Sequence, residues 1–367
     1  MKVGTSIVLG NKATPTLAAE AVANAMEKAE ISIANSLLLF LTSEFADYPQ
    51  PAIRAAAKAA NCTQVFGCSA TGIFTEDDWV LDSPAAAVMV FGGNLSIETT
   101  NLNLARQALL TLCAPNAINN TWLNDGYARY GGISGNAVGQ GPFSVWQNAK
   151  GGNTGMVNAY FAGVNLSSKA SHGIKILTKP KIIHKSNGFD IEILDHKTPL
   201  NPLLKALATV HKINTKTDDD IVLPCHLIMA IYADSLELLN KGEYQQTNVI
   251  SYDDKSGSIT LAQPLKHGVY LSWGLRDQAE SEMDLKKTII QLRDELGAIP
   301  DFGLLFSCLG RGPFYDGIDH DLKIISHELP KMPLIGFYGN GEIATIGAKN
   351  QLLPYSAVLS IFSAAIT

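Results

Sequence analysis

One pattern of strands and glycines occurs twice along this chain, and it constrains the fold more than any other feature. Each copy has three apolar segments, of which the second runs into Gly-x-x-x-x-Gly and the third follows a proline. The segments lie at 38–40, 65–72 and 84–91 in the first half and at 304–306, 334–341 and 354–361 in the second. Short apolar runs beside turn residues favour buried strands. We therefore predict two related lobes, each built as strand, helix, strand, glycine turn and strand.

Length and composition agree with a two-domain globular protein. The chain has 367 residues, of which 46% are apolar and 17% charged, so it can bury more than one core. The alternation of strands and helices predicts an α/β fold, and α+β stays open because the sequence does not give the order of strands in a sheet. A break at Pro199 and Pro202 divides the chain into predicted domains 1–198 and 199–367.

Several helices are predicted from local signals. They lie at 18–29, 51–60, 203–212 and 281–297, with a further helix and its flanks at 97–124. In the 281–297 segment, Leu285 and Ile289 fall on one helical face. Ser281 and Asp284 form a capping box at its start, and Gly297 ends it.

Charge and hydropathy exclude two classes of partner. The net charge is −6 and no Lys/Arg cluster occurs, which argues against nucleic acid. No apolar stretch approaches the roughly 20 residues that a bilayer-spanning helix needs, and the start of the chain is typical of a first strand. The five cysteines form no CxxC pair, so reduced thiols and a cytoplasmic location are the simplest interpretation.

The glycine turns are candidate binding loops. Glycine lets backbone N–H groups approach a ligand closely, and such groups can hold a carboxylate or phosphate. Polar residues stand beside the turns, namely Ser69, Tyr338, Asn340 and Glu342. The alternative is that the turns serve folding alone. No Walker or GxGxxG pattern occurs, so no cofactor is predicted.

Two charged residues next to these glycines could recognise an amino acid. Arg311 stands between Gly310 and Gly312 after an apolar segment, where a guanidinium could pair with a ligand carboxylate. Glu342 could bind the ammonium group. A structural ion pair between Arg311 and Glu342 is the alternative.

Other candidates have weaker support. Cys68 and Cys308 each precede a glycine turn and could be nucleophiles if a base such as His172 lay nearby, whereas buried inert thiols are the alternative. Arg276-Asp277 could bind a ligand or form a salt bridge at a helix start. The polar loop with Asp316, Asp319, His320 and Asp321 matches no metal motif and is expected to be solvated.

Five segments resemble motifs of the FIST family. Residues 67–72 resemble the GCS-x-x-G signature of the FIST N-terminal domain, 130–136 its FGG-type segment, and 171–174 its HGW-type strand. Residues 306–312 resemble the SC-x-GRG motif of the FIST C-terminal domain, and 333–343 its P-x-x-GFY-x-x-GEI motif. These segments follow the family's order along nearly the whole chain.

The resemblance implies a sensory module of signal transduction that binds a small ligand, with amino acids proposed for the family. The expected ligand is an amino acid or another small anionic metabolite. The two FIST parts use up the chain, so signalling is expected to need a separate partner protein. The expected ligand-binding residues are Gly67, Cys68, Ser69, Gly72, His172, Arg276, Ser307, Cys308, Arg311, Gly312, Tyr338, Asn340, Gly341 and Glu342. A cysteine-dependent hydrolase or transferase, and an interaction scaffold, are the alternatives; no catalytic or metal-binding residue is predicted.

Overall fold

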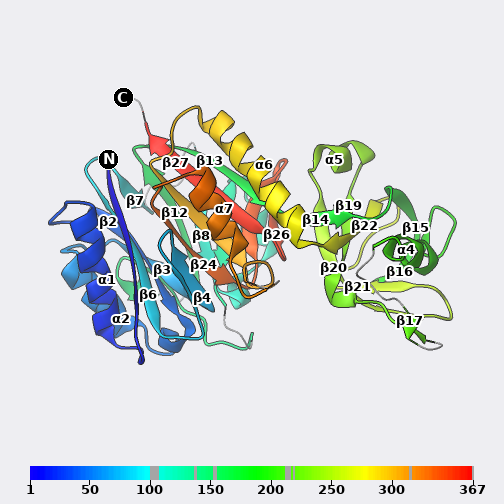
Figure 1. Cartoon of the computed structure of the whole chain (residues 1–367), viewed down its shortest axis with the longest axis horizontal. Coiled ribbons are helices and arrows are strands. Elements are labelled where there is room, and N and C mark those ends of the chain that lie inside the picture. Colours follow the sequence, from blue (N-terminus) through cyan, green and yellow to red (C-terminus); the bar gives the residue numbers. More distant parts are fainter. Residues whose placement is uncertain are drawn as a thin grey trace. The chain divides into compact units, whose positions relative to one another are not determined.

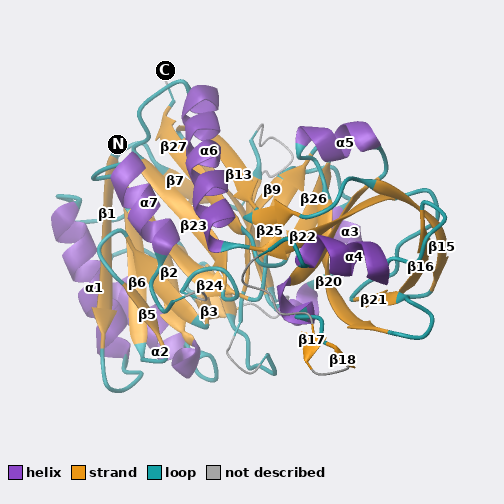
Figure 2. Cartoon of the chain, turned by 45° about the vertical axis from the view of Figure 1, so that its right-hand side comes forward, coloured by secondary structure: helices purple, strands orange, loops and turns teal. Residues whose placement is uncertain are grey.

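The computed structural model shows a protein of two compact units. It describes residues 1–99, 107–135, 139–151, 155–210, 216–217, 220–313 and 316–365. The first unit comprises Met1–His172 and Asp284–Thr367, and the second is Gly173–Met283. Helices and mixed sheets occur together (Figure 2), which confirms the predicted α/β fold of two domains. The compact units begin and end elsewhere than the expected family domains 1–198 and 199–367, which stay a prediction.

The first unit contains three six-stranded sheets with one shared plan. The first sheet runs β1 (Lys2–Leu9), β6 (Ala85–Gly92), β2 (Ser36–Thr42), β3 (Val65–Ala70), β10 (Val145–Gln147) and β11 (Lys150–Gly151). The second runs β13 (Val164–Ser171), β27 (Ala357–Ala364), β23 (Phe302–Cys308), β24 (Leu334–Gly339), β4 (Gly72–Thr75) and β5 (Trp79–Leu81). The third runs β7 (Ser96–Glu98), β12 (Met156–Ala162), β8 (Leu109–Cys113), β9 (Arg129–Ile133), β25 (Glu342–Ile346) and β26 (Lys349–Leu353).

Each sheet has one parallel pair at its centre, and all its other neighbours are antiparallel. The parallel pairs are β2 with β3, β23 with β24, and β8 with β9. The strand that follows each pair joins a different sheet, because β4 pairs with β24, β25 with β9, and β10 with β3. The three sheets are therefore interlocked around one apolar core, in which the rings of Phe302 and Phe362 stack at 4.4 Å.

A glycine stands at the same register in each parallel pair. Gly67 lies opposite Leu39, and Gly336 lies opposite Leu305. Gly131 occupies this place in the third pair, opposite Thr111. A Cβ atom on these glycines would lie 1.7, 1.8 and 1.9 Å from the facing carbonyl oxygen. Close approach of the backbones therefore requires glycine inside the strand, whereas the sequence placed Gly67 in a turn. Whether the recurrence reflects duplication stays a prediction.

The third parallel pair contradicts one predicted helix. Within 97–124, the described residues form the end of β7, strand β8, a 3-10 turn at Pro115–Ala117 and the short helix α3 (Asn120–Leu123), and residues 100–106 lie outside the description. All five residues of β8 are buried. A strand buried on both faces has no alternation, so its sequence reads like that of a buried helix.

Helices cover the outer faces of the first two sheets (Figure 1). Helices α1 (Pro15–Lys28) and α2 (Gln50–Ala59) pack on the sheet of β2, burying Ala18 and Ile53 against Leu39. Helix α7 (His320–Glu328) and the part of α6 (Gln278–Leu296) from Asp284 onward pack on β23, burying Ile289 and Ile324 against Leu305. None of the described helices combines the length and the apolar content needed to cross a membrane.

The second unit holds a seven-stranded antiparallel sheet. Its strands are β14 (Ile174–Ile176), β22 (Tyr270–Arg276), β15 (Lys181–Asn187), β16 (Asp190–Leu194), β21 (Ile259–Leu261), β20 (Gln245–Tyr252) and β19 (Ile228–Ala233). The pairing of β19 with β22 closes the sheet into a ring around Trp273. Short helices α4 (Leu200–Leu207) and α5 (Leu236–Lys241) and the small pair β17 (Lys216–Thr217) and β18 (Asp220–Ile221) complete the unit.

Candidate functional site

The glycine-bearing strands β3, β9 and β24 end close to one another. Ser134, after β9, donates its hydroxyl to the carbonyl of Ser69 in β3 at 2.6 Å. The backbone N–H of Asn340, after β24, donates to the carbonyl of Ile133 at 3.1 Å. Ligands in α/β proteins commonly bind at the carboxyl ends of parallel strands. These strand ends therefore form a candidate binding site.

Arg311 forms a buried ion pair with Asp321. Its Nε lies 2.7 Å and its Nη2 3.3 Å from the two carboxylate oxygens, and the side chains are only 1% and 5% exposed. The guanidinium also donates to the carbonyl of Ser171 at 2.7 Å and to its hydroxyl at 3.0 Å. The guanidinium hydrogen-bonds to Asp321, at the start of α7, and not to Glu342.

Asp284 and His172 extend this polar network. One oxygen of Asp284 accepts the hydroxyl of Ser171 and the backbone N–H of His172, both at 2.8 Å. Nδ1 of His172 lies 3.1 Å from the hydroxyl of Ser356. Burial lowers the pKa of His172 to about 4, with Asp284 opposing and Arg311 adding to the shift. The imidazole is therefore neutral near pH 7.

The predicted capping box is wrong, because Asp277 supplies the cap. Helix α6 begins at Gln278, and the carboxylate of Asp277 accepts the backbone N–H of Glu280 at 3.0 Å. Ser281 lies inside the helix and donates its hydroxyl to the Asp277 carbonyl at 2.9 Å. Asp284 is thereby available to the Ser171 network.

Asp319 is buried, like Asp321, although the polar loop that contains both was expected to be solvated. It accepts the hydroxyl of Tyr338 and caps α7 through the Leu322 backbone N–H at 2.8 Å. Burial, reinforced by Asp321, raises the pKa of Asp319 to about 6. Asp316 and His320 are less buried and pair with each other at 2.9 Å. Within the described ranges, no group of His, Cys, Asp and Glu is arranged to hold a metal ion.

Glu342 is fully buried at the start of β25, opposite Gly132. Neither carboxyl oxygen makes a hydrogen bond with any described residue. Burial raises the pKa of Glu342 well above its usual range, although Arg311 and the backbone N–H of Ser356 oppose the shift. Burial therefore favours the protonated, uncharged form of this carboxyl group. A buried polar group without partners is rare and calls for an explanation.

The surroundings of Cys68 and Cys308 do not favour a role as nucleophiles. Cys68 lies in β3 with no exposed surface, and burial raises the pKa of its thiol well above the ordinary value, with Cys113 adding to the shift. Cys308, at the end of β23, is also buried. The nucleophile is the thiolate, so a buried thiol with a raised pKa is in the inert form.

All predicted ligand-binding residues except Arg276 lie in the first unit. Gly72 of β4 and Ser307 of β23 both stand opposite Tyr338, and the carbonyl of Gly341 accepts the backbone N–H of Ile133 at 2.9 Å. Gly312 allows the ring of Tyr338 to approach, since a Cβ there would be 2.6 Å from it. Arg276 ends β22 in the second unit and donates to the carbonyl of His226 at 3.2 Å. Asn136 of the FGG-type segment lies outside the described residues. The role of these residues in binding stays a prediction.

Sequence reasoning missed three members of the network, Ser171, Ser356 and Asp284. Ser171 was part of a family motif, but nothing local marked its bond to Arg311, which lies 140 residues further along the chain. Asp321 was noticed only as a loop acid. A possible signal was the density of acids and hydroxyls after apolar strands, where buried polar groups need partners.

Comparison with known proteins gives one family match and several uncharacterized relatives. The family model of the FIST C domain matches residues 206–345. The uncharacterized protein Rv0628c of Mycobacterium tuberculosis strain H37Rv is 25% identical over 372 residues, which cover 94% of this chain and 95% of the relative. The uncharacterized protein Mb0898c of Mycobacterium bovis is 26% identical over 324 residues, which cover 81% and 82%.

The matched segment contains Arg311, Tyr338 and Glu342, and it draws on both compact units, because it crosses from the second to the first at Asp284. The expected N-terminal FIST domain stays a prediction. Residues 206–345 of the chain therefore match the FIST C domain, the family that the sequence motifs at 306–312 and 333–343 resemble.

Proposed function

We propose that this protein is a small-ligand-binding sensory protein that acts through a separate signalling partner. The ligand is an amino acid or another small metabolite that carries a protonated amine. The observation that carries this proposal is Glu342, a fully buried carboxyl group with two oxygens that no described residue satisfies. It lies beside the strand ends where Ser69, Ser134 and Asn340 meet.

An ammonium group is the natural complement of Glu342. Leaving a buried acceptor unsatisfied costs about 1–3 kcal/mol, and a ligand that donates to it removes this penalty. An ammonium group offers three donors and a positive charge, and their attraction to a carboxylate is strong where water is excluded. Binding would ionise Glu342, because a nearby cation lowers the pKa of a carboxyl group.

A purely anionic ligand is less well supported. Arg311 is the cation that the sequence offered for it, but Asp321 and Ser171 occupy its donors on both sides. An anion would have to displace the buried Asp321 carboxylate, which would then lose its partner. The carboxylate of an amino-acid ligand would more readily contact Asn340, which is exposed just after the end of β24.

Because Glu342 is buried, ligand binding would require a change of conformation, and such a change could carry a signal. A ligand can reach a fully buried carboxyl group only if the chain around it opens, so the ligand favours a conformation that differs from this one. A sensor requires such a difference between its bound and free states. The cysteine-enzyme alternative lacks comparable support, because the Cys68 thiol is buried and its pKa is raised.

Thermal unfolding with a panel of amino acids and simple amines tests the proposal. A ligand that binds the folded state raises the melting temperature increasingly with its concentration. We expect a stabilising ligand for the wild type, no stabilisation of Glu342→Gln, and an unchanged response of the exposed control Glu44→Gln. Lack of response across the panel, or an undiminished response of Glu342→Gln, would refute the proposal.

A further inference from the structure

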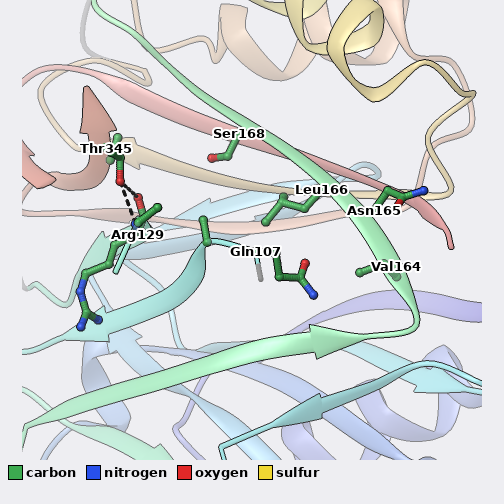
Figure 3. Close-up of a pocket in the computed structure, with 10 residues that line it drawn as sticks. Gln107, Arg129, Val164, Asn165, Leu166, Ser168 and Thr345 are labelled. Carbon is green, nitrogen blue, oxygen red and sulfur yellow. Dashed lines mark hydrogen bonds between the residues drawn. The ribbon is translucent and has the colours of Figure 1, made fainter. Parts of the chain in front are cut away.

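A separate cavity lies in the first unit between β13 and the edge formed by β8, β9 and β25. It has a volume of about 590 Å³, within the range typical of small-molecule sites. Figure 3 shows Val164 and Leu166 of β13 on one side and Gln107 and Arg129 on the other. Neither Arg311 nor Glu342 lines this cavity.

One wall of the cavity is made of small side chains. Ala108 and Ala128 directly precede the neighbouring strands β8 and β9, and the backbone N–H of Leu109 donates to the Ala128 carbonyl at 2.8 Å. Ala344 stands on the next strand, opposite Tyr130. Val164 and Leu166 form the apolar wall across from them. Alanines side by side leave a low, apolar surface, and such a surface suits a flat molecule.

Gln107 brings an unused acceptor to this cavity. Its side-chain nitrogen donates to the carbonyl of Phe161, which fixes the orientation of the amide. Its Oε1 is buried and makes no hydrogen bond with any described residue. Because an unsatisfied buried acceptor is costly, a ligand that offers an N–H or O–H group gains by binding here.

The positive charge of Arg129, which lines the cavity, is compensated by the carboxylate of Asp125. Its guanidinium is 2.5 Å from the carboxylate of Asp125 and 2.9 Å from the hydroxyl of Thr111, and it lies over the ring of Trp122. Figure 3 shows the guanidinium turned away from Gln107. The other polar residues on the walls, such as Ser168 and Thr345, are uncharged. A charged ligand would lose its hydration here without gaining a partner of opposite charge.

We propose that this cavity is a second small-molecule site, which binds an uncharged, flat compound with a hydrogen-bond donor. Primary carboxamides of aromatic rings and nucleobases belong to this class. The flat part lies against Ala108, Ala128 and Ala344, and the donor meets Oε1 of Gln107. This site differs in chemistry from Glu342, which attracts a cation.

Three probes of nearly the same shape test the proposal by calorimetry. Benzamide has the amide donor, acetophenone replaces the NH2 group with a methyl group of similar size, and benzoate replaces it with a negative charge. A fragment of this size is expected to bind with a Kd on the order of 1 mM. We expect benzamide to bind, and the other two to bind at least about tenfold more weakly.

Three variants test whether benzamide binds in this cavity. Gln107→Leu removes the acceptor, and Ala108→Leu fills the flat wall, so each should weaken benzamide binding about tenfold or more. Gln291→Leu, on the exposed face of α6, is the matched control and should leave it unchanged. If Gln107→Leu does not fold, as judged by thermal unfolding, Ala108→Leu decides the question.

The outcomes separate this site from the one at Glu342. Benzamide binding that persists in Glu342→Gln and is lost in Ala108→Leu supports the proposal. Failure of benzamide to bind, equal binding of all three probes, or undiminished binding by folded Ala108→Leu would each overturn it. None of these results depends on whether amines bind at Glu342.

Discussion

Nε of Arg311 lies 2.7 Å from a carboxylate oxygen of Asp321, and both side chains are almost completely buried. This contact assigns the guanidinium a role inside the protein. It also changes what the neighbouring Glu342 can do, because the cation that could have paired with it is already neutralised. The unsatisfied group at the strand ends is thus a carboxyl group, and the proposed ligand carries a protonated amine.

Removing Arg311 should destabilise the protein severely. Arg311→Ala leaves Asp321 buried without its partner, and breaking a buried pair in this way costs about 3–5 kcal/mol. The double variant Arg311→Met, Asp321→Leu should recover most of this loss, since it removes both charges. Urea unfolding measures these free energies. Lys241→Ala, which breaks the exposed pair with Glu237, is the control and should cost less than about 1 kcal/mol.

Asp319 should make the protein less stable as the pH rises from 4 to 6. Its pKa rises from 3.8 in the unfolded chain to about 6 in the folded protein, so the folded state holds the proton more tightly. The resulting stabilisation is complete below pH 3.8 and is lost as the pH passes 6, with a total of about 2–3 kcal/mol. The difference in unfolding free energy between wild type and Asp319→Asn should therefore fall across this window.

His172 should act in the opposite direction. Its pKa falls from 6.5 to about 4 on folding, so its contribution is present above pH 6.5 and is lost as the pH falls toward 4. The difference between wild type and His172→Gln should thus shrink on acidification. Comparing each variant with wild type at every pH removes the common contribution of Glu342, whose raised pKa acts in the same sense as Asp319. Parallel curves for wild type and both variants would show that neither group is perturbed.

Alanine should not be tolerated at the glycines of the parallel pairs. In Gly336→Ala the Cβ would be 1.8 Å from the Leu305 carbonyl oxygen, so the two strands would have to separate. We expect a loss of more than about 3 kcal/mol or failure to fold, in line with strong overpacking. Gly151→Ala has open space around the new atom and should change stability by less than about 0.5 kcal/mol. Similar stabilities for the two variants would contradict the shared plan of the three sheets.

Thiol labelling should distinguish buried from accessible cysteines. Cys62 is partly exposed, whereas Cys68 and Cys113 are buried. In the native protein near neutral pH, Cys62 should react with a thiol reagent much sooner than the other two, which should become reactive only on unfolding. Mass spectrometry of the labelled peptides gives the order. Rapid native labelling of Cys68 would revive the cysteine-enzyme hypothesis.

The sequence predicted the strands that carry local signals. The apolar runs at β2, β3, β23 and β24 were recognised, and so was the glycine in each second strand. The third parallel pair was missed because β8 is buried on both faces and Gly131 stands in a glycine-rich stretch. Pairings such as β4 with β24 join residues more than 250 positions apart, and local patterns carry no record of them.

The candidate site was predictable in its parts but not in its contacts. Arg311 and Glu342 stood out because they follow apolar strands and adjoin glycines. Their partners did not, because Asp321 and Ser171 reach Arg311 from a helix and a strand that the sequence does not place beside it. Which of the two charges stays unsatisfied depends on those tertiary contacts alone.

Calorimetric titration of the wild type and Glu342→Gln with the amine ligand found by thermal screening tests the central claim most directly. Gln keeps the shape of the side chain but cannot ionise, so it removes the charge alone. We predict measurable binding by the wild type and by Glu44→Gln, and a loss of at least about tenfold in affinity for Glu342→Gln, because a charged hydrogen bond is replaced by a neutral one. Equal affinities for wild type and Glu342→Gln would contradict the claim that Glu342 recognises the ligand.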